Sequence, residues 1–412
     1  MKLTIIFDNF GPYHLARVRA AAGVMAMTGV ELRGRSRTYG WNPAAEVSFR
    51  RLTLPDAEQG GRGGRVELAG HLERALDESR PEVVAVNGWG DFLAPQSIRW
   101  CVRKKVPLVM MSESSAMDGP RLPVREMIKR RLVGLASSAL VGGKPHREYV
   151  RELGLRDEDV FNGYNAVDNE YFAGASQRVR GEEGRLERRY FLASNRFIGR
   201  KNLEMLVDGY AEYAGLAGGR GERGVWGMCL LGDGELRGEL IGHCQRRGLV
   251  VREEAPWEGG GRGEMTGVGV VYFPGFRQVE ELPRFYAHAG CFVHPAVTEP
   301  WGLVVNESMA SGLPVLVSRG VGCASDLVRE GENGYGFDPR DAGMLAGLMG
   351  RVAGKAEGEL AAMGEASRRI IGEWGPERFA RGLKAAAERA LEVGPKRAGL
   401  VDRMLLEGLC WR

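Results

Sequence analysis

The chain has 412 residues, of which 44% are hydrophobic and 27% are charged, and its formal net charge at pH 7 is +4. This length suggests two or three domains, and the ordinary composition excludes a disordered or fibrous chain. A charge this close to balance gives no reason to expect nucleic acid as a partner. The six cysteines include no Cys-x-x-Cys pair, and no apolar run reaches the roughly 18 residues of a membrane span. We therefore expect a protein of a reducing, cytoplasmic compartment.

Short apolar strands alternate with helical patterns in the first part of the chain. Residues 3–7 predict a buried strand, too short for the apolar core of a signal peptide, and a helix follows from about Tyr13. This alternation predicts a parallel sheet covered by helices on both faces. The further strands expected are 30–33, 83–86, 108–111 and 139–141, and the further helices are 71–78 and 95–104.

Residues 121–135 combine basic side chains with apolar residues at helical spacing. A basic amphipathic helix can dock on an anionic membrane. The same pattern is typical of a helix packed on a sheet with its basic face in solvent. We favour the packed helix and keep peripheral contact with the inner face of a membrane as the alternative.

A second set of alternating elements follows a change in composition. Residues 173–189 are rich in Gly, Arg and Glu, which predicts a solvated, mobile linker. We expect an α/β protein with a first domain at 1–172 and a second at 190–373. The expected strands of the second domain are 190–194, 225–231, 270–273, 291–294 and 315–318, with a Gly-rich loop at 254–269 and an amphipathic helix at 376–391.

Two carboxylates stand eight positions apart after the strand expected at 291–294. Glu299 falls in the loop that follows this strand, where ligands bind in open α/β sheets. Gly302 and Leu303 fall at a helix start, where free N–H groups and the helix dipole favour an anion. Glu307 lies inside that helix, near enough to its start to reach the same crevice. Because carboxylates accept hydrogen bonds from vicinal hydroxyls, the pair suits a sugar or a ribose.

The stretch from Glu299 to Glu307 contains Pro-Trp-Gly-Leu and is followed by Ala-Ser-Gly-Leu-Pro-Val. In this context it resembles the Glu-x7-Glu signature of retaining, nucleotide-sugar-dependent glycosyltransferases of family 4, which have the GT-B fold. A surface helix with two solvated glutamates is the alternative. The resemblance implies two Rossmann-like domains facing each other across a cleft, with a terminal helix at about 374–412 packed back on the first domain. It also implies that Glu299 contacts sugar hydroxyls, Glu307 binds the ribose, and the backbone around Trp301 faces the sugar and diphosphate.

A departing nucleoside diphosphate carries charge that a metal, or cations and helix ends, must stabilise. The sequence shows no Asp-x-Asp cluster at a strand end, so we expect no metal requirement. Arg196 and Lys201 follow the strand at 190–194 and resemble the Arg-x4-Lys element of the family, which holds the two phosphates. A basic surface turn is the alternative. Arg200 adjoins them without a counterpart in the family.

Other segments resemble the family more loosely. Phe276 ends a segment that resembles the one near the nucleobase, and the Gly-Asp-Gly turn at 232–234 either shapes the pocket or makes no ligand contact. Gly11 matches the position of the Gly-rich first loop of the family, where backbone approaches a ligand. His14 follows it and is either exposed to the cleft or a packing or capping residue.

The acceptor side departs from the family. Many members place a histidine after the strand at 108–111, whereas this chain has Ser112 and Glu113 there. Glu113 is therefore a candidate for contacts with acceptor or sugar hydroxyls. Trp89 and Asp91, at the end of the preceding strand, and His14 are the other acceptor-side candidates.

The resemblance implies transfer of a sugar from a UDP or GDP sugar to an acceptor hydroxyl, with retention of configuration. The nucleotide-sugar is a co-substrate, and no bound cofactor is expected. The acceptor would be a sugar, lipid or metabolite, in polysaccharide, glycolipid or glycoconjugate biosynthesis. The alternatives are a nucleotide-sugar-binding protein without turnover and a GT-B nucleotide-sugar epimerase. An oxidoreductase is disfavoured, since no Gly-x-Gly-x-x-Gly follows the first strand.

Overall fold

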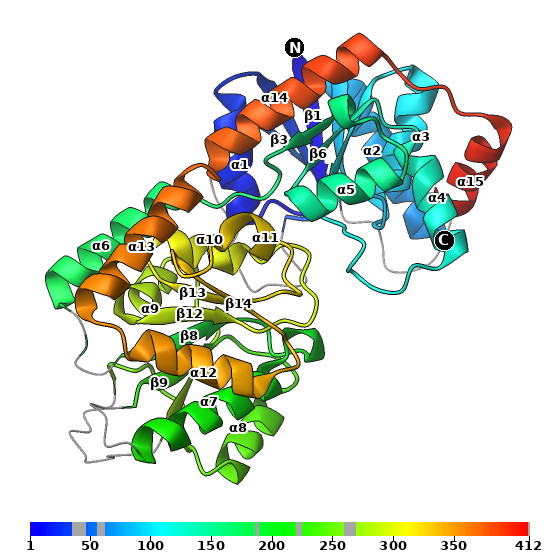
Figure 1. Ribbon diagram of the computed structural model, residues 1–412. Coiled ribbons are helices and arrows are strands. Elements are labelled where there is room, and N and C mark those ends of the chain that lie inside the picture. The colour runs from blue at the N-terminus through cyan, green and yellow to red at the C-terminus, as the bar shows by residue number, and fades with distance from the viewer. Residues whose placement is uncertain are drawn as a thin grey trace. The chain divides into compact units, whose positions relative to one another are not determined.

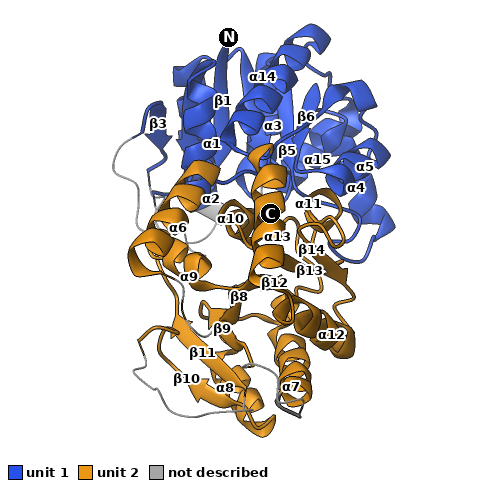
Figure 2. Cartoon of the chain, turned by 60° about the vertical axis from the view of Figure 1, so that its left-hand side comes forward, with its two compact units in different colours: residues 1–168, 374–412 blue, residues 169–373 orange. Residues whose placement is uncertain are grey.

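The computed structural model describes residues 1–34, 47–55, 62–184, 186, 189–219, 225–258 and 269–410. They form two compact units, coloured separately in Figure 2. Unit 1 comprises Met1–Asp168 and Trp374–Arg412, and unit 2 comprises Asn169–Glu373. Each unit is built on its own parallel sheet flanked by helices, so the predicted α/β class with two Rossmann-like domains is confirmed.

Unit 1 has a seven-stranded sheet in the order β3-β2-β1-β4-β5-β6-β7, with each neighbouring pair parallel (Figure 1). Its strands are β1 (Lys2–Phe7), β2 (Ala26–Glu31), β3 (Arg50–Thr53), β4 (Val83–Asn87), β5 (Leu108–Ser112), β6 (Ser138–Val141) and β7 (Val160–Asn162). Its helices are α1 (Pro12–Ala22), α2 (Arg62–Ser79), α3 (Leu93–Lys104), α4 (Pro123–Val133), α5 (Lys144–Glu152), α14 (Pro376–Val393) and α15 (Leu400–Cys410).

Both faces of this sheet are buried, which is why its strands are apolar runs rather than alternating ones. Successive residues of a strand point to opposite faces. In β1, Ile5 accordingly joins the core that contains residues of α1 and α14, and Ile6 joins the core that contains residues of α2 and α3. The side chains of both residues are at most 1% exposed.

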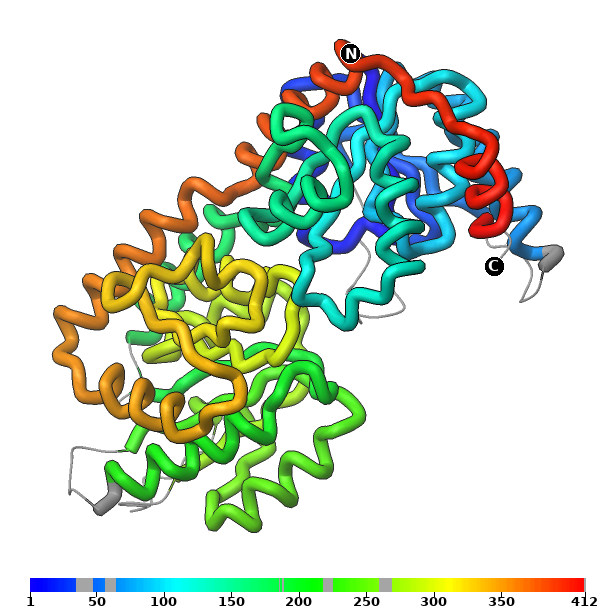
Figure 3. Tube along the Cα trace, turned by 45° about the vertical axis from the view of Figure 1, so that its right-hand side comes forward, coloured from blue at the N-terminus to red at the C-terminus, as the bar shows by residue number. Residues whose placement is uncertain are grey.

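The carboxyl-terminal helices complete unit 1. Helix α14 runs alongside α1, as Figures 1 and 3 show. The Ser138 hydroxyl of β6 donates to the Ala386 carbonyl of α14 at 2.7 Å. Helix α15 contacts α3, where the Gln96 amide donates to the Cys410 carbonyl at 3.0 Å. The end of the chain thus packs on the unit that contains its beginning.

Unit 2 has a seven-stranded sheet in the order β10-β11-β9-β8-β12-β13-β14, again with parallel neighbours. Its strands are β8 (Tyr190–Ser194), β9 (Gly227–Leu231), β10 (Val250–Arg252), β11 (Val270–Gly275), β12 (Cys291–His294), β13 (Val315–Ser318) and β14 (Gly334–Phe337). Its helices are α6 (Asn169–Glu183), α7 (Leu203–Gly219), α8 (Arg237–Arg246), α9 (Leu282–His288), α10 (Leu303–Ala310), α11 (Ala324–Leu327), α12 (Ala342–Ala353) and α13 (Glu357–Gly372).

The linker predicted at 173–189 is wrong over most of its length, because residues 173–183 belong to helix α6. This helix contacts α9, α10 and α13. Phe172 and Ser176 are buried in the contact, and the Arg180 guanidinium donates to the carbonyls of Ala287 and Ser311 at 3.0 and 2.7 Å. Small residues let this helix pack closely without large apolar side chains, so composition alone suggested a solvated segment. The predicted Gly-rich loop at 254–269 lies outside the described residues from 259 to 268.

Candidate functional site

The candidate residues of unit 2 gather at the carboxyl edge of its sheet. Strands β8, β12 and β13 are neighbours and run parallel, so the segments that follow them leave from the same edge. The segment after β8 carries Arg196 and Lys201, and the segment after β12 carries Glu299. The loop after β13 reaches the same place, since the Glu299 amide donates to the Gly320 carbonyl at 3.1 Å.

Glu299 is the centre of an ion-pair cluster. Its Oε2 lies 2.7 Å from Lys201 Nζ and 2.7 Å from Arg200 Nη1. The side chains of Lys201 and Glu299 are only 10% and 13% exposed, whereas that of Arg200 is 44% exposed. Burial lowers the pKa of Lys201, and the charge of Glu299 opposes this shift. The half-buried Arg196 also lowers the pKa of Lys201, so three cations share this edge.

Arg200 is a residue that the sequence reasoning left out. The 3-10 turn Gly199–Lys201 places it beside Lys201, and both side chains reach the same carboxylate. The contact joins residues 99 positions apart. Its position next to Lys201 in the sequence could have indicated a role at the same site, but the family resemblance assigns no role to this position.

Helix α10 begins beside this cluster, and only glycine fits at its start. Gly302 is the N-cap residue, with φ +94° and ψ 62°. A Cβ at this position would lie 2.9 Å from Val321 Cγ1 and 3.3 Å from His294 Cδ2. The first N–H groups of a helix have no partners within the helix. The amide of Leu303 and those that follow it are therefore suited to an anion.

The Trp301 side chain supports the loop between Glu299 and α10. Its side chain is buried, and its Nε1–H donates to Asn306 Oδ1 at 2.9 Å. Its carbonyl accepts from the Cys323 amide at 3.1 Å. The ring therefore fixes the path of the backbone between Glu299 and α10 and belongs to the packing of the loop.

Glu307, in the second turn of α10, is fully buried. The Tyr286 hydroxyl of α9 donates to its Oε2 at 2.8 Å. A buried carboxylate requires such partners, because loss of one leaves charge uncompensated. The two glutamates of the Glu-x7-Glu pattern thus differ: Glu299 is held by cations near the surface, and Glu307 is held by a tyrosine inside the unit.

Several buried polar atoms at this edge lack hydrogen-bond partners among the described residues. They are both ring nitrogens of His294, both amide atoms of Asn195 and Nδ2 of Asn306. Unsatisfied buried polar groups are rare because each one costs free energy. Their concentration here leaves hydrogen-bonding capacity for a bound molecule.

His294 is a second residue that the sequence reasoning missed. It ends β12, is fully buried and stacks on Phe292 with ring centroids 6.4 Å apart. Burial, and then the charges of Lys201 and Arg200, lower the pKa of His294 well below its ordinary value. The ring is therefore neutral at pH 7. Its position directly before the Glu299 loop could have indicated a place in the site, but the sequence pattern assigned it only to a strand.

Two weaker elements border the same edge. Gly232, with φ +131°, follows β9, and a Cβ there would lie 1.9 Å from the Asn195 carbonyl oxygen. The Gly-Asp-Gly turn therefore packs directly on the backbone that leads to Arg196. Phe276 follows β11 and is 40% exposed.

The unit 1 candidates lie around the carboxyl edge of the other sheet. Gly11 is the N-cap of α1 with φ −75°, a conformation open to any residue. His14 lies against Phe7, with ring centroids 4.3 Å apart. Burial, and then the charge of Arg17, lower the pKa of His14 well below its ordinary value. His14 is thus a neutral, packed histidine.

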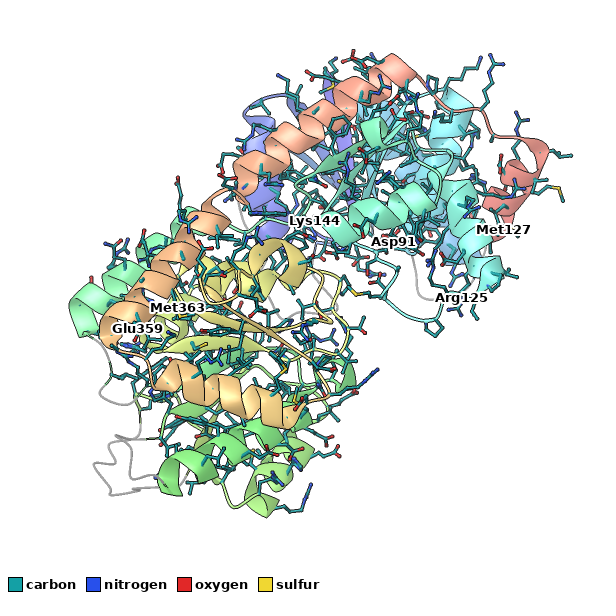
Figure 4. The ribbon with its side chains drawn as sticks, in the orientation of Figure 1. Asp91, Arg125, Met127, Lys144, Glu359 and Met363 are labelled. Carbon is teal, nitrogen blue, oxygen red and sulfur yellow. The ribbon has the colours of Figure 1, made fainter. Side chains whose placement is uncertain are left out.

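The remaining unit 1 candidates also contact structural neighbours. Asp91, labelled in Figure 4, accepts from the Ala94 amide at 2.8 Å and so caps α3. Burial raises the pKa of Asp91, and the charge of Asp8 adds to this effect. Trp89 packs against Tyr149 with ring centroids 6.4 Å apart. Glu113 is half-buried, and its charge raises the pKa of the buried Arg17, against the lowering by burial.

Among the described residues, no three His, Cys, Asp or Glu side chains are placed to share a metal ion. No helix in the described part of the chain is both long and apolar enough to cross a bilayer.

Two family models match separate parts of the chain. Residues 13–162 match the "Glycosyl transferase 4-like domain", and residues 267–369 match "Glycosyl transferases group 1". The second match contains Glu299, Gly302 and Glu307.

Curated relatives match over short segments. The chain is 43% identical over 79 residues to sulfoquinovosyl transferase SQD2 of Arabidopsis thaliana, which is 18% of this chain and 15% of that protein. It is 34% identical over 93 residues to a probable sucrose-phosphate synthase 5 of Oryza sativa subsp. japonica, which is 21% of this chain and 9% of that protein. The chain thus matches less than a fifth of the length of either relative.

Solved structures match over nearly the whole chain. HepE of Anabaena, determined in complex with UDP, has a TM-score of 0.67 at 16% identity, and the match covers 93% of this chain and 98% of that one. Sucrose-phosphate synthase from Thermosynechococcus elongatus has a TM-score of 0.70 at 18% identity, with 93% and 97% covered. These likenesses establish the GT-B fold. The matches to two glycosyltransferase domain models, over 13–162 and 267–369, together with this fold support a glycosyltransferase enzyme.

Proposed function

We propose that the chain transfers a sugar from a nucleoside diphosphate sugar to an acceptor hydroxyl, with retention of configuration, as a member of family 4. The observation that carries this proposal is the Glu299 carboxylate held by Lys201 and Arg200 beside the start of α10. Cations, a helix N-terminus and a carboxylate that can accept hydrogen bonds from sugar hydroxyls thus lie at one sheet edge. The HepE structures, determined with UDP and with UDP-glucose, support a uridine nucleotide as the first donor to test.

The cations would bind the diphosphate and stabilise it as the leaving group. Lys201 and Arg196, with the first amides of α10, supply this charge. Glu299 would accept hydrogen bonds from sugar hydroxyls. In the free chain, Glu299 pairs with Lys201 and Arg200, which keeps a nearly buried lysine neutralised until the donor phosphates arrive. Glu307, fixed by Tyr286, would bind the ribose.

The chemistry needs no covalent enzyme intermediate in this proposal. The bond between the sugar and the diphosphate breaks as the acceptor oxygen bonds to the sugar carbon. The acceptor proton passes to an oxygen of the departing diphosphate, which Lys201 and Arg196 stabilise. His294 stays neutral beneath the helix start, so it adds no further charge to this edge.

The acceptor belongs to the classes of sugar, lipid or small metabolite. We propose a cytoplasmic protein that is able to contact a membrane surface through α4. Val124 and Met127 of this helix are 64% and 54% exposed, and Figure 4 labels Met127 together with Arg125. Apolar side chains next to basic ones favour an anionic lipid surface.

Thermal-shift measurements with nucleoside diphosphates and their sugars test the donor site. Binding to the folded chain raises the melting temperature. We expect a shift with one nucleotide that persists in EDTA and is lost in Lys201→Ala. Lys355→Ala, which removes a partly exposed lysine paired with Glu359 at 2.9 Å, is the matched control and should keep the shift. Absence of a shift with every nucleotide would contradict the donor site.

Turnover separates an enzyme from a binding protein. The wild-type chain, given the selected nucleotide-sugar and a panel of acceptors, should release the nucleoside diphosphate and form a glycosylated product. A chain that binds the donor but forms no product, and releases no diphosphate, would instead be the binding protein.

A further inference from the structure

Unit 2 contains a cavity of about 420 Å³ that the donor site does not use. It is lined by residues of α6, the end of α9, the turn after α10, and α13. Helices α6 and α13 contact each other, and both are labelled in Figures 1 and 2. The volume is within the range of small-molecule sites, roughly 300–1,000 Å³.

The cavity lies at the edge of the sheet opposite to Lys201 and Glu299. Its lining includes Arg189, directly before β8, Gly290, directly before β12, and Pro314, directly before β13. These are the amino ends of the same three strands whose carboxyl ends carry the donor-site segments. These strands are four or five residues long. At 3.3 Å per residue, about 13 to 17 Å therefore lie between the cavity and the donor-site segments. The cavity is therefore a second site in this unit.

Among the described residues, the lining contains three arginines, Arg180, Arg189 and Arg368, and one carboxylate, Glu365. Arg180 is fixed by the carbonyls of Ala287 and Ser311. The other two guanidinium groups pair with exposed carboxylates: Arg189 with Glu357, and Arg368 with Glu365 at 2.6 Å.

A ligand could replace the carboxylates of these two ion pairs with little loss of folding stability. The side chains of Glu357 and Glu365 are 57% and 71% exposed, and exposed pairs contribute little to stability. The side chains of Arg189 and Arg368 are 22% and 39% exposed, so they are better shielded than those of their partners. Arginine recognises phosphate and carboxylate groups through two parallel hydrogen bonds.

The lining also includes a buried histidine, His288, that has an unpartnered ring nitrogen among the described residues. The side chain of His288 is 1% exposed, and its Nε2 lies 3.0 Å from Glu183 Oε2. Its Nδ1 has no partner among the described residues. A buried polar atom without a partner costs free energy that a ligand can recover.

We propose that this cavity binds a small phosphorylated metabolite. Displacement of Glu357 and Glu365 from their ion pairs would free two guanidinium groups, those of Arg189 and Arg368, which matches the roughly −1.5 to −2 charge of a phosphate monoester at pH 7. The remaining volume and the apolar lining residues Leu313, Pro314 and Leu360 accommodate the carbon skeleton of the metabolite.

Calorimetric titration of the full chain with glucose 6-phosphate, with glucose and inorganic phosphate as the other two probes, tests this proposal. We expect glucose 6-phosphate to bind, and Arg368→Glu to weaken its affinity about tenfold or more. Arg369→Glu is the matched control: Arg369 is the next residue, pairs with Glu332 outside the lining and is 65% exposed. It should bind within about twofold of wild type. Arg368→Gln repeats the test without charge reversal if Arg368→Glu fails to fold.

Three results would overturn the proposal. One is the absence of glucose 6-phosphate binding at millimolar concentration. Another is equal affinity in wild type and Arg368→Glu. The third is equal affinity for inorganic phosphate and glucose 6-phosphate, which would make the cavity an ion site. Retained binding in Lys201→Ala would show that the probe does not occupy the donor site, so this test stands apart from the test of the proposed function.

Discussion

The carboxyl edges of the two sheets differ in what their polar residues do. In unit 2, Lys201 and Arg200 converge on Glu299, and the buried side-chain polar atoms of His294 and Asn195 lack hydrogen-bond partners among the described residues. In unit 1, Asp91 caps α3, His14 packs against Phe7, and the charge of Glu113 acts on the buried Arg17. Similar scaffolds thus carry one edge with strong, concentrated charge and one edge whose candidates are engaged in packing and capping.

This difference explains why the unit 2 residues could be assigned chemical roles and those of unit 1 could not. A diphosphate leaving group requires concentrated positive charge, which leaves a recognisable pattern in sequence and structure. An acceptor hydroxyl requires only orientation, for which many residue types suffice. An acceptor-binding edge, the role we propose for unit 1, is therefore free to vary in composition.

The largest effect is expected from Glu299→Gln. The amide keeps the size of the side chain but loses the charge that pairs with Lys201 and that we propose accepts hydrogen bonds from sugar hydroxyls. We expect kcat/KM for release of the nucleoside diphosphate to fall by about 10² to 10³. The exposed Glu332→Gln is the control and should keep full activity. A loss smaller than about fivefold would remove Glu299 from the reaction.

Tyr286→Phe removes the hydroxyl that donates to Glu307 at 2.8 Å. A hydrogen bond to a charged group contributes about 1.5–3 kcal/mol, so we expect nucleotide affinity to fall about tenfold, measured by titration calorimetry. Tyr190→Phe removes a similar buried bond, to the Phe285 carbonyl at 2.7 Å, at the amino edge. It should lower stability but keep nucleotide affinity. Equal losses of affinity in both variants would indicate a general effect on unit 2.

The stability of unit 2 should depend on pH through His294. The pKa of this buried ring lies well below its ordinary value of 6.5. As pH falls below about 6.5, the unfolded chain takes up a proton there and the folded chain does not, so the folded state loses stability. Between pH 7 and 5, His294→Gln should lose about 1–2 kcal/mol less free energy of unfolding than wild type. Urea unfolding at both pH values measures this, and equal losses would show that His294 is protonated in the folded chain.

The smallest effect is expected on the unit 1 edge. Asp91→Ala removes the cap that accepts from the Ala94 amide, at a cost of about 1 kcal/mol. Thermal unfolding should report this loss, while the shift produced by the nucleotide stays unchanged. A diminished nucleotide shift in this variant would contradict the division of roles between the two edges.

Strongly apolar segments were predicted well from sequence. The strands expected at 190–194, 291–294 and 315–318 have the same bounds as β8, β12 and β13. These strands lie inside a parallel sheet, where burial on both faces selects continuous apolar runs. The unpredicted strands are short and lie toward the sheet edges, where this constraint is weaker. They are β3, β7, β10 and β14.

Contacts between distant parts of the chain could not be predicted. Arg200 reaches Glu299 only because β8 and β12 are neighbours in the sheet, although the two residues are 99 positions apart in the chain. In the sequence, His294 is only the last residue of an apolar strand. The fold brings Gly302 against its ring, next to the Glu299 loop. Helix α6 was missed because its packing uses small residues and the Arg180 guanidinium.

The most direct test is a crystal structure of the chain with the nucleoside diphosphate that the thermal-shift panel selects. We predict density for the diphosphate beside Lys201 and the start of α10, with Glu299 released from its ion pair with Lys201. Density for the nucleotide at any other place, with the pair between Glu299 and Lys201 intact, would contradict the assignment of this edge as the donor site.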